Sequence, residues 1–318
     1  MNAKQKSSHT FELLYIIGII AISFSSIFIK WSTAEVSVVA MYRLYLTNLL
    51  MLPLAWRYRN ELFHLSARQW SMLAWSGIAL GLHFLLWMAS LRLTTVASST
   101  VFLSLEPILV MLGSYFFFRT KTNRMMIIGM GMAILGSLAI ASGDFKLSGQ
   151  ALTGDVLSIL GTVAVSVHML IGKHLREQLS AFVYNFWVFM IAATSLALYN
   201  IVQGYPFTGY APREWGIFLL LAIVPTLFGH YLFNWLLKYI NAAAVSMAVL
   251  GEPVFSSLLA WMLLGEKLTP LQFGAGAFIL AGVWLFIRYG RGDNKVVELP
   301  VDRTAPDVPV MPNDKIAN

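Results

Sequence analysis

Two glutamates, each followed directly by proline, stand inside long apolar stretches of the sequence. Glu106 and Pro107 lie in "SLEPILV", and Glu252 and Pro253 lie in "VLGEPVFSS". A carboxylate inside an apolar segment that crosses a bilayer costs about 2.5 to 3.5 kcal/mol on insertion scales, so such a residue is seldom kept without a use. Depending on its protonation state, it can bind the ammonium group of a substrate or carry a coupling proton.

The proline beside each glutamate has a structural consequence. Proline lacks a backbone N–H and bends or breaks a helix, which frees carbonyl groups that a protein can direct at a ligand. Pro107 and Pro253 are therefore predicted helix bends, each with a carboxylate beside it. In a structural alternative, proline only bends the helix, and glutamate bonds to a neighbour such as Ser99 or Ser256. The repetition of the pair favours a functional site.

Histidine, asparagine and tryptophan residues recur at helical spacing near the glutamates. His83 and Trp87 are four residues apart, and so are His230 and Asn234. Residues at this spacing share one face of a helix. His83 and His230 also stand at nearly corresponding places before the two Glu-Pro pairs. We therefore predict a substrate or proton site that comprises Glu106, Glu252, His83, Trp87, His230, Asn234 and Trp235.

A second set of polar residues is predicted to line the path to this site or to form its gates. Ser23, Ser26 and Lys30 follow one face of the apolar run that begins near residue 12, and Lys173 takes a place comparable to that of Lys30 in a later run. Arg43 is expected to pair with a carboxylate or with carbonyl groups, which favours a structural role.

The composition defines the class of protein that positions these residues. Of 318 residues, 58% are hydrophobic and 12% are charged, and the mean hydropathy is +0.70, which predicts an integral membrane protein. The formal net charge of +7 does not indicate a nucleic-acid partner, because the basic residues lie between apolar runs. The absence of cysteine excludes disulfides, thiolate metal sites and cysteine nucleophiles.

Ten apolar runs are long enough to cross a bilayer, which requires about 20 residues per helix. The fold class is therefore predicted to be all-α, with ten transmembrane helices over residues 12–31, 36–56, 70–91, 95–118, 124–142, 153–173, 181–202, 214–237, 242–264 and 270–289. The first run is longer than the apolar part of a secretory signal and lacks a cleavage site, so we interpret it as a retained helix.

Lysine and arginine accumulate on the cytoplasmic side of membrane proteins. With a cytoplasmic N-terminus, 16 of the 22 basic residues lie in the cytoplasm, and Arg43 lies inside a predicted helix. Only five lie outside: Lys30, Arg92, Lys146, Arg213 and Lys267. This asymmetry predicts a multi-pass protein of the cell membrane with both termini cytoplasmic.

The sequence also repeats itself. A shift of 146 residues superposes Glu106 on Glu252 and Pro107 on Pro253, and a shift of 143 superposes Lys30 on Lys173. The chain is accordingly divided into a first half at 12–142, an external joint at 143–152 and a second half at 153–289. Five helices per half bring the second half into the membrane from the opposite face, which makes an inverted repeat of the kind found in secondary transporters.

Two stretches of the chain resemble a known family. "HFLLWMASLRLTTVASSTVFLSLEP" (from His83) and the segment from "GHYLFNWLL" to "GVWL" (229–285) are similar to the two EamA-type repeats of the drug/metabolite transporter superfamily. The resemblance covers about residues 12–288 and implies a cofactor-free carrier, often an exporter, with a central cavity. It also gives a gate role to Glu266 in "LGEKLTP", whereas Thr120 stands at the corresponding place in the first half.

Three classes of function fit a membrane protein, and the secondary transporter fits this one best. An intramembrane enzyme would need a nucleophile and base or metal ligands in a recognisable motif, and a non-transporting scaffold would not need repeated carboxylates. No phosphate-binding loop of an ATP-driven pump occurs in the sequence. We predict a gradient-driven or exchange carrier of small amphipathic metabolites, amino acids or related compounds, working outwards by alternating access.

Two terminal segments complete the predicted organisation. Residues 1–11 form a cytoplasmic N-terminus, and residues 290–318, rich in proline and charge, form a disordered cytoplasmic tail. The expected partners are a small-molecule substrate and the lipid bilayer. A coupling proton and a homodimer are both compatible with this organisation.

The predicted orientation can be tested with reporter fusions. Fusions after Lys121 and after Arg291 should both report cytoplasm, because the basic residues around them belong to the cytoplasmic majority. An external signal from either fusion would contradict the inverted arrangement of two five-helix halves.

Overall fold

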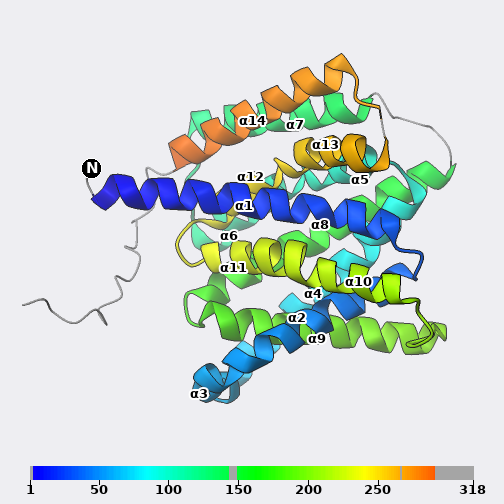
Figure 1. Cartoon of the computed structure of the whole chain (residues 1–318). Coiled ribbons are helices and arrows are strands. Elements are labelled where there is room, and N and C mark those ends of the chain that lie inside the picture. The colour runs from blue at the N-terminus through cyan, green and yellow to red at the C-terminus, as the bar shows by residue number, and fades with distance from the viewer. Residues whose placement is uncertain (1–2, 143–148, 266, 291–318) are drawn as a thin grey trace, which may run out of the picture.

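The computed structural model describes residues 3–142, 149–265 and 267–290, and all the regular secondary structure in these ranges is helical (Figure 1). The first repeat contains α1 (Ala3–Trp31), α2 (Val36–Ala55), η1 (Trp56–Tyr58), α3 (Arg59–Phe63), α4 (Ala67–Leu93), α5 (Val96–Leu103), α6 (Glu106–Phe118) and α7 (Arg124–Ser142). The second contains α8 (Gly149–Arg176), α9 (Ala181–Gln203), α10 (Pro212–Leu221), η2 (Ala222–Tyr231), α11 (Leu232–Leu236), α12 (Ala242–Val249), α13 (Glu252–Leu264) and α14 (Pro270–Gly290).

The helices confirm the all-α membrane fold. Among the described residues, nine segments are long and apolar enough to cross a membrane, and α7 is a shorter apolar helix over Arg124–Ile140. Four helices begin earlier than predicted. The differences are largest for α1, which begins at Ala3 instead of residue 12, and for α8, which begins at Gly149 instead of residue 153, and smaller for α4 at Ala67 and α10 at Pro212. The hydropathy pattern located only the apolar part of each helix, and polar residues can continue a helix beyond the bilayer.

Side-chain caps fix where several helices begin. Ser66 and Gln69 form a reciprocal capping box at the start of α4. Thr95 caps α5 by accepting a hydrogen bond from the Ser98 N–H at 3.1 Å, and Asn241 caps α12 by accepting one from the Ala244 N–H at 2.7 Å. Thr95 and Asn241 are 146 residues apart, so the repeat extends to the signals that start these half-length helices.

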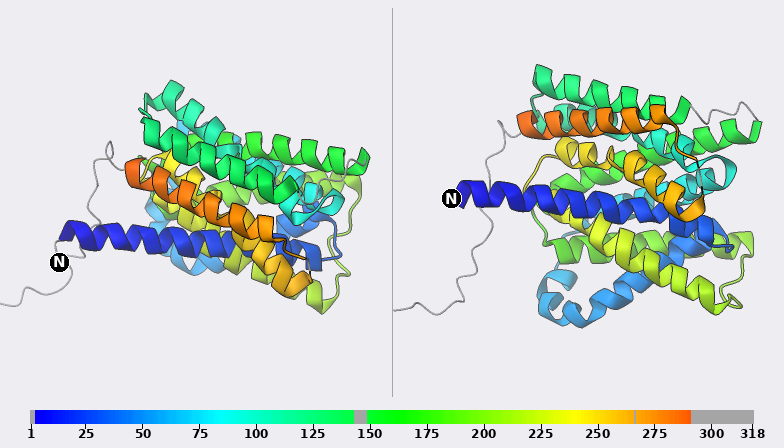
Figure 2. Two further views of the ribbon diagram at one scale, coloured as in Figure 1. Left: turned by 90° about the horizontal axis from the view of Figure 1, so that it is seen from above. Right: turned by 45° about the horizontal axis from the view of Figure 1, so that its top comes forward.

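The two repeats are intertwined. Helix α1 of the first repeat packs on η2 and α13 of the second, and α8 of the second packs on α4, α5 and α6 of the first. Helices α2 and α9 form a further contact between the repeats, and so do α7 and α14 (Figure 2). Helices α1 and α8 start at opposite ends of the molecule, as an inverted repeat requires (Figure 1).

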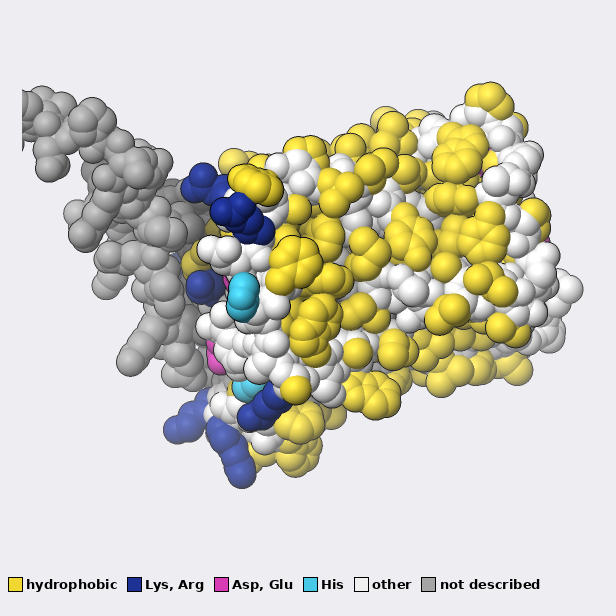
Figure 3. All heavy atoms as spheres, turned by 90° about the horizontal axis from the view of Figure 1, so that it is seen from below, with side chains coloured by type: hydrophobic (Ala, Val, Ile, Leu, Met, Phe, Trp, Pro, Cys, Tyr) yellow, Lys and Arg dark blue, Asp and Glu magenta, His cyan; other side chains and the backbone are white. Residues whose placement is uncertain are grey.

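The outer surface is divided by residue type. Hydrophobic side chains cover most of the face in Figure 3, and Lys and Arg side chains gather at one end of it. This basic end contains the start of α1 and the end of α14 (Figure 1). The two ends of the described chain therefore lie on the same side, as an even number of spans requires.

Helices α7 and α14 approach each other through glycines. A Cβ atom added to Gly129 of α7 would lie 2.6 Å from the Gly282 carbonyl oxygen and 2.8 Å from the Phe286 backbone nitrogen. Neither backbone atom can move aside as a flexible side chain can. This close contact agrees with the general use of small residues between membrane helices.

Gly129→Ala should therefore lower the free energy of unfolding by about 1–3 kcal/mol, as overpacking typically does. The measurement is an unfolding titration of the purified protein in detergent micelles. Gly131→Ala in the same helix is the matched control, because a Cβ there meets nothing within 4 Å. Equal stability of the two variants would contradict the close packing.

Candidate functional site

The fourth span of each repeat is broken near its middle. Helix α5 ends at Leu103 and α6 begins at Glu106, and hydrogen bonds of the i to i+3 type connect them, such as Leu105 N–H to the Phe102 carbonyl at 3.2 Å. The second repeat has the same break between α12 and α13, where Gly251 N–H donates to the Ala248 carbonyl at 3.0 Å. Each glutamate is thus the first residue of a half-helix.

The prolines start these half-helices and do not kink a continuous helix. Pro107 and Pro253 occupy the first turn of α6 and α13, where a backbone N–H would have no intrahelical acceptor. The predicted bend is therefore a complete break. The positive end of each half-helix dipole lies beside its glutamate, which stabilises an anionic group there.

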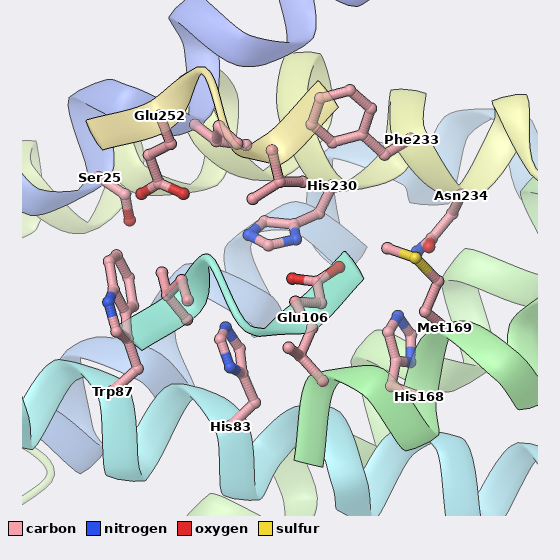
Figure 4. Close-up of a pocket in the computed structure, with 14 residues that line it drawn as sticks. Ser25, His83, Trp87, Glu106, His168, Met169, His230, Phe233, Asn234 and Glu252 are labelled. Atoms are coloured by element: carbon pink, nitrogen blue, oxygen red, sulfur yellow. The ribbon is translucent and has the colours of Figure 1, made fainter. Parts of the chain in front are cut away.

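The two breaks face each other. Helix α13 packs against α5, and α6 packs against α12, so the broken spans cross. The carboxyl groups of Glu106 and Glu252 point into the same space, with His230 between them (Figure 4). The side chains are 2% and 4% exposed, so both carboxyl groups belong to the interior. Two charged carboxylates in this arrangement would repel each other.

A cavity lies between the breaks. The volume that the centre of a water molecule can occupy in it is about 40 Å³. This is room for a few water molecules. Both repeats supply its walls, through α1, α4, the α5–α6 break, α8, η2, α11 and the α12–α13 break. The lining residues are Ile22, Ser25, His83, Trp87, Leu103, Glu106, Val165, His168, Met169, His230, Phe233, Asn234, Val249 and Glu252.

Two buried polar atoms at the cavity have no protein partner among the described residues. Glu106 Oε1 and Trp87 Nε1 are buried and have no hydrogen-bond partner among the described residues. Buried polar atoms in proteins are nearly always paired, so each exception needs an explanation. Binding of a ligand group or of water would satisfy both atoms.

The histidines at the cavity differ in how firmly they are held. His83 Nδ1 lies 3.0 Å from the Gly161 carbonyl, and its ring stacks on Trp87 with centroids 5.9 Å apart. His168 Nδ1 lies 2.9 Å from the Ser76 hydroxyl, which is the interhelical contact expected of a structural histidine. The ring of His230 meets Phe84 edge to face at 5.1 Å. Within the described ranges, no cluster of three or more potential ligands could hold a metal ion.

Arg43 of α2 lies beside the cavity, at 0% exposure. Its Nε donates to Thr226 Oγ1 at 2.8 Å, its Nη1 donates to Ser25 Oγ at 3.1 Å, and its guanidinium lies 4.3 Å from the centre of the Phe84 ring. We expected a carboxylate or carbonyl partner; the structure provides hydroxyl groups and an aromatic face. Arg43 interacts electrostatically with Glu252, but no ion pair within 4 Å joins them.

Some predicted residues lie away from the cavity. The indole of Trp235 packs on Tyr239 at 4.6 Å and does not line the cavity, while Ser23 and Ser26 bond back to carbonyls of α1. Their neighbour Ser25 faces the cavity (Figure 4). Glu266 lies outside the described residues.

The two predicted lysines lie at helix ends in equivalent places. Lys30 donates to the Thr94 carbonyl at 3.1 Å, and Lys173 donates to the Leu237 carbonyl at 2.9 Å. Both bonds span 64 residues, and the two donors are 143 residues apart, as are the two acceptors. Each lysine therefore binds the carbonyl that follows the third span of its own repeat.

The same shift corrects the expected correspondence of the histidines. The third spans end at Leu93 and Leu236, which are 143 residues apart. On this count Trp87 corresponds to His230, and His83 corresponds to Thr226. The two histidines are thus not equivalent, although both line the cavity.

The sequence reasoning missed several residues that the structure brings forward. Ser25, Met169 and Phe233 line the cavity, and Glu61 and Glu214 bond across the repeats at the ends of the molecule. Ser25 lies three residues after Ile22 and therefore shares a face of α1 with it. This spacing identifies Ser25 as a cavity residue only if it is already known that this face of α1 is buried. Glu214 follows Pro212 at the start of a span and has the pattern of an ordinary helix start.

The crossed broken helices and the shared cavity define a two-repeat membrane transporter. The family model of the EamA-like transporter family matches residues 10–142 and again residues 152–288. The chain therefore belongs to the EamA-like transporter family, and each of its halves is one copy of the repeat.

Similar proteins are named as transporters. An uncharacterized transporter of Archaeoglobus fulgidus is 27% identical over 198 residues, which cover 60% of this chain and 67% of that protein. The uncharacterized transporter YcbK of Bacillus subtilis is 24% identical over 294 residues, which cover 85% and 91%. One protein crystal structure superposes with a TM-score of 0.73 at 17% identity, covering 88% of this chain and 96% of the other, and shows the shared fold.

The contacts of Arg43 predict energetic coupling to η2. A hydrogen bond to a charged group contributes about 1.5–3 kcal/mol, so a double-mutant cycle of Arg43→Gln and Thr226→Val should give a coupling energy of this size in detergent unfolding titrations. Thr194→Val is the control partner, because the Thr194 hydroxyl bonds to Tyr45 instead. Additive effects of Arg43→Gln and Thr226→Val would show that the Arg43–Thr226 bond does not hold Arg43.

Proposed function

We propose that the chain is a secondary transporter of the cell membrane that exports small amphipathic metabolites, amino acids or related compounds, by alternating access. The observation that carries the proposal is the pair of buried carboxyl groups facing one cavity at the breaks of two equivalent spans. Half-helix ends in the middle of a bilayer are a recurrent way for transporters to bind substrates and coupling ions.

The carboxyl groups give a mechanism for coupling. A carboxylate can bind either a proton or the ammonium group of a substrate, and occupation by one excludes the other. A carrier that reorients only with the carboxylate neutralised would then exchange substrate for protons. Protons that enter down their gradient would drive the substrate outwards.

The walls of the cavity support an amphipathic substrate. Leu103, Val165, Met169 and Phe233 are apolar, and Trp87 adds an aromatic face that suits apolar or cationic groups. A hydrophobic part of the substrate can pack on these side chains while its ammonium group lies between the carboxyl groups. The cavity is small in this structure, so the repeats must move apart to admit a metabolite.

The orientation is also part of the proposal. The basic end of the molecule would lie in the cytoplasm together with both termini, because the positive-inside rule applies to short loops of this kind. Export then means passage from the basic end towards the end that carries the α1–α2 loop.

Counterflow in liposomes tests this function. Purified protein, screened with labelled amino acids, nucleosides and organic cations, should exchange amphipathic amines. Glu252→Gln and Glu106→Gln should reduce exchange by about ten- to hundredfold, because loss of a charged hydrogen bond costs about 1.5–3 kcal/mol. We expect Glu252→Gln to be more damaging, since Arg43 interacts electrostatically with Glu252, and His230 and Asn234 precede Glu252 in the family-like segment of the sequence.

The exposed Glu35→Gln is the control and should transport like the wild type. Glu106→Gln and Glu252→Gln should both remain folded in the membrane, because glutamine keeps the volume of the side chain. If both transport at wild-type rates across a pH series, the carboxyl groups are structural and the proposed coupling is wrong.

A further inference from the structure

The loop between α1 and α2, residues 32–35, is bound to the second repeat by one carboxylate. Glu214 of α10 is 5% exposed. It accepts hydrogen bonds from the Ser32 hydroxyl at 2.5 Å, the Thr33 backbone N–H at 3.0 Å and the Thr33 hydroxyl at 3.0 Å. Hydrogen bonds to a charged acceptor are about twice as strong as neutral ones. Glu214 therefore links α10 of the second repeat to a loop of the first.

An arginine of the first repeat binds the same loop from the other side. Arg92, near the end of α4, donates to the Ser32 carbonyl at 2.7 Å and to the Ala34 carbonyl at 3.2 Å. One N–H group and two hydroxyl groups of the loop are thus bound to a carboxylate, and two of its carbonyl groups are bound to a guanidinium.

The opposite end of the molecule has the same construction. The loop between α8 and α9, residues 177–180, is bound by Glu61 of α3, which accepts a hydrogen bond from the Ser180 backbone N–H at 2.5 Å. Arg176 at the end of α8 donates to the Leu179 carbonyl of this loop. Helix α3 and the start of α10 lie at opposite ends of the molecule (Figure 1).

The arrangement is reciprocal. Glu214 belongs to the second repeat and binds a loop of the first, whereas Glu61 belongs to the first repeat and binds a loop of the second. Each loop is also bound by an arginine of its own repeat. Neither glutamate lines the cavity between the broken helices.

We infer that Glu214 and Glu61 are the gate residues of the two ends. Movement of one repeat against the other must break the bonds of one glutamate to open one end, while the other glutamate keeps the opposite end closed. The hydrogen bonds of both glutamates are formed in this structure. The inference rests on the alternating access proposed above, and it assigns each end to one carboxylate.

A purely structural role would give a different result. If the glutamates only capped loops, their loss would lower stability without opening one end in preference to the other. Side-specific access to the cavity therefore distinguishes a gate from a cap.

The chain contains no cysteine, so a single introduced thiol can report this access. Val165→Cys places a thiol on the cavity wall, and the labelling of this thiol does not require the variant to transport. Its labelling by a membrane-impermeant maleimide is measured in right-side-out and inside-out vesicles. In this background, Glu214→Ala should raise the labelling rate about tenfold from the side of the α1–α2 loop only, and Glu61→Ala should do so from the side of the α8–α9 loop only.

Two neighbouring carboxylates serve as matched controls. Glu35 is exposed in the α1–α2 loop, and Glu177 is 54% exposed in the α8–α9 loop. Glu35→Ala and Glu177→Ala should leave the labelling rate unchanged. Should an alanine variant fail to accumulate in the membrane, Glu214→Gln or Glu61→Gln replaces it with the same expected direction.

Equal labelling from both sides, or no change in either variant, would overturn the assignment. The assay needs no substrate, so its result is independent of the transport screen. Failure of the screened compounds to exchange would contradict the proposed substrates, and only the labelling pattern decides whether these glutamates are gates.

Discussion

Satisfaction of backbone polar groups in a bilayer is the constraint on which this structure depends. Lipid offers no hydrogen bonds, so a span can be interrupted only where protein surrounds the interruption. The breaks at residues 104–105 and 250–251 meet this condition, because α1 packs on α13 and α8 packs on α5 and α6. The same enclosure buries Glu106 and Glu252. The broken backbone, the buried carboxyl groups and the central cavity are therefore consequences of one packing arrangement.

The inverted repeat provides that arrangement twice. Thr95 and Asn241 start equivalent half-helices, and Lys30 and Lys173 bind equivalent carbonyl groups. Each long first span packs mainly against the other repeat, so neither half could enclose its own break alone. The interlocking explains why the two halves form one cavity instead of two separate ones.

Much of this architecture could be predicted from local signals. Apolar runs located the spans, the Glu-Pro pairs located the breaks, and the repeat brought the two glutamates together. Contacts between distant segments could not be predicted. Ser32 and Glu214 are 182 residues apart, and neither departs from ordinary loop or helix-start chemistry. Ser25 faces the cavity, and Ser23 and Ser26 do not, because of how α1 packs. The π-helical segment η2, which carries Thr226 and His230, has no single-residue signature in the sequence.

The frame of the molecule is nearly symmetric, but the chemistry within it is not. Where the first repeat presents the indole of Trp87 to the cavity, the second presents the imidazole of His230. Under the alternating access proposed above, a molecule in the cavity would meet Trp87 and His83 from the first repeat and His230 from the second. Inward-facing and outward-facing forms would exchange the roles of the two repeats and would therefore surround that molecule with different side chains. Unequal affinities at the two membrane faces would follow, even though a two-fold axis relates the movements of the two backbones.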